Sequence, residues 1–239
     1  GCTSGYPIED LGLVYVLGID KGEKSHHAIS VKIPVFDPTA EAKSIYIEGE
    51  GVSVRNALKS INEQTEKHLV LGQTRAVVVG EELAKAGFDS HLDILTRDPE
   101  FPLTAVVLVS NSKARDFIKE PVPTNPKFGD YLKEALKTAQ DSGLLLGINL
   151  NHYYVRRAAE GWDPCLPYLK GQKGKIQELG TALFRDDKMV GNIGMVESQL
   201  LVILSSKAYN TALSFDDPLE PDIGITDRKY VSVEVIKSK

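Results

Sequence analysis

The chain has 239 residues and is 42% apolar, so it can bury the core of one large or two ordinary domains without disulfide bonds. Its formal net charge is −5 and its basic residues are scattered among acidic ones, which excludes a nucleic-acid partner that binds through a basic stripe. The longest near-continuous apolar stretch, residues 11–19, is about half of the ~20 residues that a membrane-spanning helix requires, so we expect no such helix.

The first half of the chain predicts the order βββαβαβα. Residues 11–20 and 28–36 form a strand hairpin, residues 44–49 form a third strand, and Ser53 can cap the helix that follows. Residues 72–110 then predict a strand, a helical crossover and a strand. Both of these strands are continuous runs of β-branched and apolar residues, which is typical of parallel strands covered on both faces. We expect this unit at the centre of a mixed sheet.

The second half predicts helices followed by strands. Residues 120–126 contain three prolines and cannot continue a helix or join a central strand. An amphipathic helix begins at Phe128, and a second helix covers residues 149–160. A third helix, residues 196–204, lies among four strands, at residues 164–169, 177–184, 212–215 and 230–236.

The predicted fold class is therefore α+β (mixed α/β) with two domains. Residues 1–10 form a tether and residues 11–119 an N-terminal domain with a mixed sheet and packed helices. Residues 120–126 form a linker, and residues 127–239 a second domain of helices with an antiparallel or mixed sheet.

The patterns that resemble catalytic or binding motifs are each interpreted as structural features. The sequence Glu48-Gly49-Glu50-Gly51 stands before a helix, as a nucleotide-binding glycine motif does, but the third glycine is replaced by Val54, so we interpret it as a tight strand-to-helix turn. The five histidines show no metal-ligand spacing and read as solvated or capping residues. We expect no catalytic residue, metal or cofactor, and therefore no enzyme.

Two further patterns allow two readings each. Arg97, Asp98 and Glu100 carry both charge signs in a loop before a buried strand, and they form either a partner surface or a solvated, capped connection. Cys2 follows Gly1 and precedes a polar tether, as the lipidated cysteine of a bacterial lipoprotein does, although a cloning remnant gives the same start. The other cysteine, Cys165, has no His or Asp pattern beside it and reads as a small buried hydrophobe.

Several short motifs, in this order and spacing, resemble the Ger(x)C family, the lipoprotein C subunit of spore nutrient-germinant receptors. In the first half they are IEDLGLV at residues 8–14, GIDKG at 18–22, GEG at 49–51, the GEELA-containing segment 72–84 and LTRDPE at 95–100. In the second half, GTALF at 180–184, DDKMVG at 186–191 and the final strand at 230–239 match. The tether lacks the family's Trp-Asp-Arg-Arg residues, and family members usually continue into a third domain, so we expect this chain to cover the first two.

The resemblance implies a non-enzymatic lipoprotein anchored through Cys2 to the outer face of the spore inner membrane. There it would assemble with integral-membrane A and B subunits, so that nutrients trigger germination. It implies no cofactor and no germinant pocket in this subunit, so direct small-molecule binding is not expected. The alternative is a solute-binding lipoprotein of a membrane transport system, which would need a cleft between two hinged domains.

Overall fold

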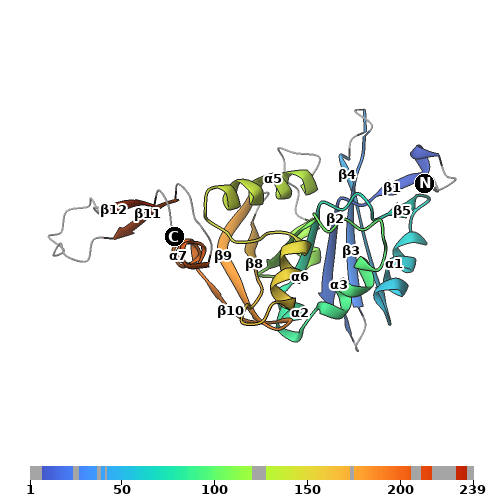
Figure 1. Ribbon diagram of the computed structural model, residues 1–239. Helices are drawn as coiled ribbons and strands as arrows, with labels where there is room; N and C mark the ends of the chain where they lie inside the picture. Colours follow the sequence, from blue (N-terminus) through green and yellow to red (C-terminus); the bar gives the residue numbers. More distant parts are fainter. Residues whose placement is uncertain are drawn as a thin grey trace.

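A computed structural model describes residues 7–23, 27–36, 39–40, 42–119, 128–172, 175–205, 211–216 and 230–235 (Figure 1). Cys2 and the predicted linker at residues 120–126 lie outside these ranges. In the described part, no helix is both long and apolar enough to cross a membrane.

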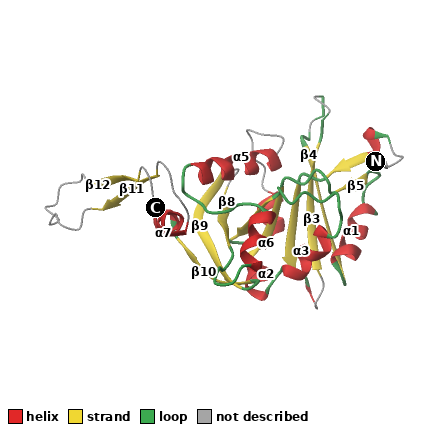
Figure 2. Ribbon diagram, viewed as in Figure 1, coloured by secondary structure: helices red, strands yellow, loops and turns green. Residues whose placement is uncertain are grey.

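The fold is built on one mixed sheet with helices packed against it (Figure 2). The sheet has eight strands, in the order β10-β9-β8-β7-β6-β2-β3-β4. Neighbours among β2, β6, β7 and β8 run parallel, and both ends of the sheet are antiparallel. This confirms the predicted mixed α/β class, with β6 and β7 in the interior. The strands are β2 (Val16–Lys21), β3 (His27–Pro34), β4 (Ser44–Gly51), β6 (Ala76–Gly80), β7 (Val106–Ser110), β8 (Cys165–Gln172), β9 (Lys175–Arg185) and β10 (Lys188–Ile193).

Helices cover both faces of this sheet. Along β6, Val77 and Val79 face one core cluster, and Ala76 and Val78 face the other, which explains why the strand is a continuous apolar run. The first cluster includes residues of α1 (Val54–Asn62), α2 (Glu81–Ala86), α3 (Asp89–Thr96) and α6 (Leu150–Ala158). The second includes residues of α4 (Ala114–Lys119) and α5 (Phe128–Asp141).

The glycines before α1 have a packing role. Strand β4 continues to Gly51, two residues beyond the predicted end, so the EGEG sequence belongs to the strand and is not the predicted turn. A Cβ atom on Gly49 would lie 2.8 Å from the carbonyl oxygen of Ala57, and one on Gly51 would lie 2.6 Å from the Ala57 nitrogen. Glycine at these positions lets α1 pack closely on β4, and Ser53 caps the helix as predicted.

The first predicted strand is divided in two. Its beginning, β1 (Leu11–Leu13), pairs in parallel with β5 (His68–Val70), a short strand that the sequence did not indicate. The division arises because the backbone changes partner at Val14 and Tyr15: Val14 N donates to Val70 O, and Tyr15 N donates to Lys32 O. A 3-10 helix, η1 (Ile8–Asp10), precedes β1.

The large sheet contains strands from both sides of the predicted linker. Strand β8 pairs with β7 through Val109↔Tyr168 and Ser110↔Leu169, and α6 contributes Leu150 and Tyr153 to the same core as β6 and β7. The predicted division of the chain at residues 120–126 is therefore not a division between two sheets. Outside the large sheet lie α7 (Met195–Ser205) and the antiparallel pair β11 (Thr211–Asp216) and β12 (Tyr230–Val235), at the end of the molecule remote from β1 (Figure 1).

Candidate functional site

The carboxyl ends of β2, β6 and β7 lie side by side, and the chain leaves β6 and β7 toward opposite faces of the sheet. After β6 it enters α2, which packs in the first core cluster, and after β7 it enters α4, which packs in the second. Open α/β sheets bind ligands in the crevice formed by such a change of side. Here the crevice holds a cavity of about 160 Å³, lined by Asp20, Lys21, Glu81, Glu82, Asn111, Ser112 and Lys113.

Asp20 occupies the position that an anionic ligand would take beside α4. Its Oδ1 accepts a hydrogen bond from Ala114 N at 2.7 Å, and its Oδ2 accepts one from Arg115 N at 2.9 Å. Burial raises the pKa of this carboxyl, and the two backbone hydrogen bonds act in the opposite direction. The side chain therefore closes the first turn of α4 to an exogenous phosphate or carboxylate.

A second, larger cavity lies on the other side of Asp20, over the end of the sheet formed by β3 and β4. It measures about 400 Å³. Its walls come from β2, β3, β4, α4 and the end of α1, and its polar lining residues are Asp20, Ser30, Glu48, Glu50, Ser60, Gln64 and Arg115. It combines several charged groups with enough volume for a small molecule. We take it as the candidate functional site.

The side chains of this cavity are held in part by their neighbours. Tyr46 donates its hydroxyl hydrogen to Glu48 Oε2 at 2.8 Å, and Gln64 Nε2 donates to the Glu48 carbonyl oxygen at 2.9 Å. Burial, followed by the hydrogen bond to Glu48, raises the pKa of the Tyr46 phenol, so this residue stays a neutral donor. The buried Ser30 side chain also hydrogen-bonds the Tyr46 phenol and acts to lower its pKa, against the larger effects of burial and Glu48.

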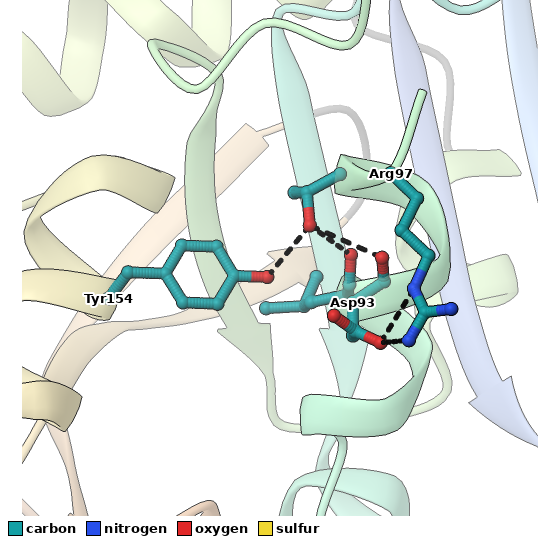
Figure 3. A network of polar contacts seen from close by, with 5 residues as sticks. Asp93, Arg97 and Tyr154 are labelled. Carbon is teal, nitrogen blue, oxygen red and sulfur yellow. Dashed lines mark hydrogen bonds and ion pairs between the residues drawn. The ribbon is translucent and has the colours of Figure 1, made fainter. Parts of the chain in front are cut away.

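The predicted partner surface lies elsewhere, at the end of α3. Arg97, Asp98 and Glu100 are exposed, and none of them lines the cavity. Arg97 donates to Asp93 Oδ2 from Nε at 3.0 Å and from Nη2 at 2.7 Å, on the side of the helix away from the Tyr154 ring (Figure 3). Asp98 Oδ1 accepts from Glu100 N at 3.0 Å. The loop is thus internally bonded and exposed, which is compatible with both readings of the sequence.

Two side-chain clusters were missed from the sequence. His91, predicted to be solvated or capping, is 6% exposed, and its Nε2 lies 2.5 Å from Nδ1 of His27. Burial, with a smaller contribution from His27, lowers the pKa of His91 to about 4. The pair joins residues 64 positions apart, so no local spacing could have revealed it.

The second missed cluster ties α3 to α6. Tyr153 donates its hydroxyl hydrogen to Asp89 Oδ1, and Arg157 Nε donates to Asp89 Oδ2 at 3.0 Å. Arg157 also pairs with Asp186 in the β9–β10 turn, at 3.3 Å. Tyr153 and Arg157 are spaced i, i+4 on α6, but Asp89 is remote in sequence.

Cys165 is buried, as predicted, and burial raises the pKa of its thiol. Among the described residues, no group of three or more His, Cys, Asp or Glu side chains is placed to hold a metal ion. Cys2 lies outside the described residues, so its predicted lipidation remains a prediction.

Comparison with known proteins gives one match to a family model, described as the spore germination protein N-terminal domain, over residues 5–171. This range begins just before η1 and ends in β8, so it runs across residues 120–126 without interruption.

Three relatives illustrate the similarity. Spore germination protein GerQC of Bacillus cereus is 22% identical over 240 residues, covering 100% of this chain and 65% of GerQC. Spore germination protein KC of Bacillus subtilis (strain 168) is 27% identical over 182 residues, covering 70% of this chain and 44% of that protein. The crystal structure of the GerBC protein aligns with a TM-score of 0.46 at 17% identity, over 84% of this chain and 58% of that one. The chain therefore spans only part of the length of each.

Proposed function

Because the chain belongs to the Ger(x)C family of spore germination proteins, we propose that it is the C subunit of a spore nutrient receptor and assembles with integral-membrane A and B subunits. The observation that carries this proposal is the family match over residues 5–171, which includes most of the large sheet and both of its helical layers. The names of the relatives describe spore germination proteins and no enzymatic activity. The chain would then act by binding its partners and not by catalysis.

Anchoring through Cys2 is the second part of the proposal. After removal of a signal peptide, acyl chains on Cys2 would contribute about 0.8 kcal/mol for each buried CH₂ group, so two or three chains would hold the protein at the outer face of the spore inner membrane. The segment between Cys2 and Leu11 extends by at most ~3.5 Å per residue, so the start of β1 would stay within ~30 Å of the bilayer. This places it within reach of integral-membrane partners.

The anchor is tested with Cys2→Ala in the full-length precursor, expressed in a spore-forming host that lacks the A and B subunits. We expect the variant to move from the membrane fraction to the soluble fraction, whereas Cys165→Ala, a change at the buried cysteine, should leave the distribution unchanged. Continued sedimentation of the Cys2 variant with the membrane would show that lipid at this position is not the anchor.

Assembly is tested by affinity purification of the tagged full-length protein from solubilised spore membranes. We expect the A and B subunits to be retained with it. Failure to retain either, while the tagged protein itself is intact and in the membrane fraction, would contradict the proposal.

The same experiment tests the loop at the end of α3 as a partner surface. Arg97→Glu reverses an exposed charge that pairs with Asp93 at i,i+4, and Lys59→Glu on α1 reverses an equally exposed charge that pairs with Glu63 at i,i+4. If the loop contacts the partners, Arg97→Glu lowers their retention and Lys59→Glu does not. Equal retention by both variants would show that the loop is only a solvated connection.

A further inference from the structure

The outer face of α7 carries a stripe of exposed apolar side chains. Val196, Leu200 and Leu204 follow the spacing i, i+4, i+8, so the stripe is about 12 Å long at 1.5 Å per residue. Leu204, at its end, is 85% exposed. On the inner face, Val202 is buried in a small core cluster with Cys165. A helix that is apolar on both faces is typical of one that is covered on both faces.

The stripe leads into a groove at the β9–β10 end of the large sheet (Figure 1). The groove measures about 470 Å³, and Trp162, Val190 and Leu204 contribute exposed apolar side chains to it. Arg156 and Arg185 also line it, and the Arg156 guanidinium lies 4.8 Å from the centre of the Trp162 ring. Exposed apolar side chains that gather around a tryptophan and arginines are typical of a protein-binding surface.

The charges beside the stripe favour a second copy of this chain over a bilayer. Helix α7 contains no Lys or Arg, and its one charged residue is the exposed Glu197. Helices that lie on bilayers are usually rich in Lys and Arg on their polar face. Here negative charge lies at the beginning of the stripe, and the two groove arginines lie at its end, beside Leu204. Such a surface is complementary to its own copy turned by 180°.

We propose that α7 packs against α7 of a second copy in an antiparallel pair with two-fold symmetry. Leu200 is the middle residue of the stripe, so the two copies of Leu200 meet near the symmetry axis. Val196 of each copy then packs over Leu204 of the other, and Glu197 of each copy reaches the two groove arginines of the other. The pairing does not depend on the proposed receptor function and can fail without it.

The test is sedimentation equilibrium of the purified 239-residue chain over a range of concentrations, with Cys2→Ala to prevent a disulfide at that residue. One helix and one groove form a small interface, so we expect the average mass to rise reversibly from one chain toward two. Leu204→Glu should weaken the association by about tenfold or more, because it places a carboxylate in an apolar contact.

Val52→Glu is the matched control for Leu204→Glu. It places the same charge on an exposed apolar residue next to β4, at the opposite edge of the large sheet, and should leave the association unchanged. Because both side chains are exposed, both variants should keep the unfolding midpoint of the monomer.

Charge exchange tests the two-fold arrangement. Arg185→Glu and Glu197→Arg each bring like charges together across the interface and should weaken the association by roughly threefold to tenfold. The double variant restores opposite charges and should recover most of the affinity. Within the described ranges these two residues form no ion pair with each other, so the recovery would arise between copies.

A disulfide at the axis tests the register of the pair. In the Cys2→Ala background, Leu200→Cys should give a covalent dimer under mild oxidation, and Val52→Cys should not. The proposal is overturned by a chain that stays monomeric at all concentrations, by a dimer that Leu204→Glu does not weaken, or by a double charge variant that recovers no affinity. A monomer that sediments with anionic lipid vesicles, and loses this binding in Leu204→Glu, would assign the stripe to a bilayer and also overturn it.

Discussion

At the scale of single residues, His91 makes folding sensitive to acid. Its pKa is lowered from 6.5 to about 4 in the folded protein, chiefly because the ring is buried. Between these values the unfolded chain binds a proton that the folded chain does not, so the free energy of unfolding falls as the pH is lowered through this window. The full effect of the shift is about 3 kcal/mol, reached near pH 4, and it is absent above pH 7.

Urea unfolding at pH 7.5 and pH 5 measures this prediction. Wild-type protein should lose stability between the two, and His91→Gln should lose markedly less, because glutamine cannot take up the proton. His152→Gln changes an exposed histidine and should retain the wild-type pH dependence. An unchanged dependence in His91→Gln would assign the acid sensitivity to other groups.

Contacts between residues that lie far apart in the chain, such as the pair His27 and His91, could not be predicted from the sequence. Local rules found the cap at Ser53 and the buried character of Cys165, since both depend on neighbours in the chain or on residue type. The pairing of His27 with His91 depends on how β3 packs against α3, and the cavity around Ser30 depends on where α4 crosses the sheet.

At the scale of elements, a partly buried polar cluster centred on Tyr153 ties α6 to α3. Tyr153 is 1% exposed and bonds Asp89, which also accepts from Arg157. Burial and the Asp89 carboxylate both raise the pKa of the Tyr153 phenol, so the hydroxyl remains a donor over the ordinary pH range.

Removing this donor should destabilise the fold. Tyr153→Phe leaves the Asp89 oxygen without its buried partner and should cost about 1–3 kcal/mol. Tyr154→Phe removes a hydroxyl that contacts Thr96 at 3.3 Å in a half-buried position, and should cost less than about 1 kcal/mol. Denaturant unfolding of the two variants compares them, and equal losses would show that the bond from Tyr153 to Asp89 adds no more stability than the contact between Tyr154 and Thr96.

Sequence patterns identified most elements but not their partners. The apolar runs of β6 and β7 predicted interior parallel strands correctly, because a strand that is buried on both faces is apolar at successive positions. Strand β5 was missed because three half-buried residues carry no periodicity. The separation of β1 from β2 was also missed, because the two strands follow each other in one apolar stretch and only their pairing partners differ.

At the scale of the whole molecule, the large sheet makes the two sides of residues 120–126 depend on each other. Proline content suggested a boundary there, but composition cannot show that β8 returns to pair with β7. A fragment of residues 7–119 would expose the edge of β7 and lose Leu150, Tyr153 and Leu166 from the first core cluster.

We expect this fragment to be unfolded or aggregated, and a fragment of residues 7–193, which ends with β10, to unfold cooperatively. Dispersion of amide resonances and circular dichroism during heating distinguish the two states. A well-dispersed spectrum from residues 7–119 alone would show that they fold as a separate domain, as the prolines suggested.

The proposed receptor role is tested most directly by nutrient-triggered germination of spores in which the receptor containing this chain is the sole nutrient receptor. Disruption of the gene for the full-length protein should abolish the response to nutrients, and complementation with the intact gene should restore it. Disrupted spores that germinate on the same nutrients at the wild-type rate would contradict a role for this protein as a receptor subunit.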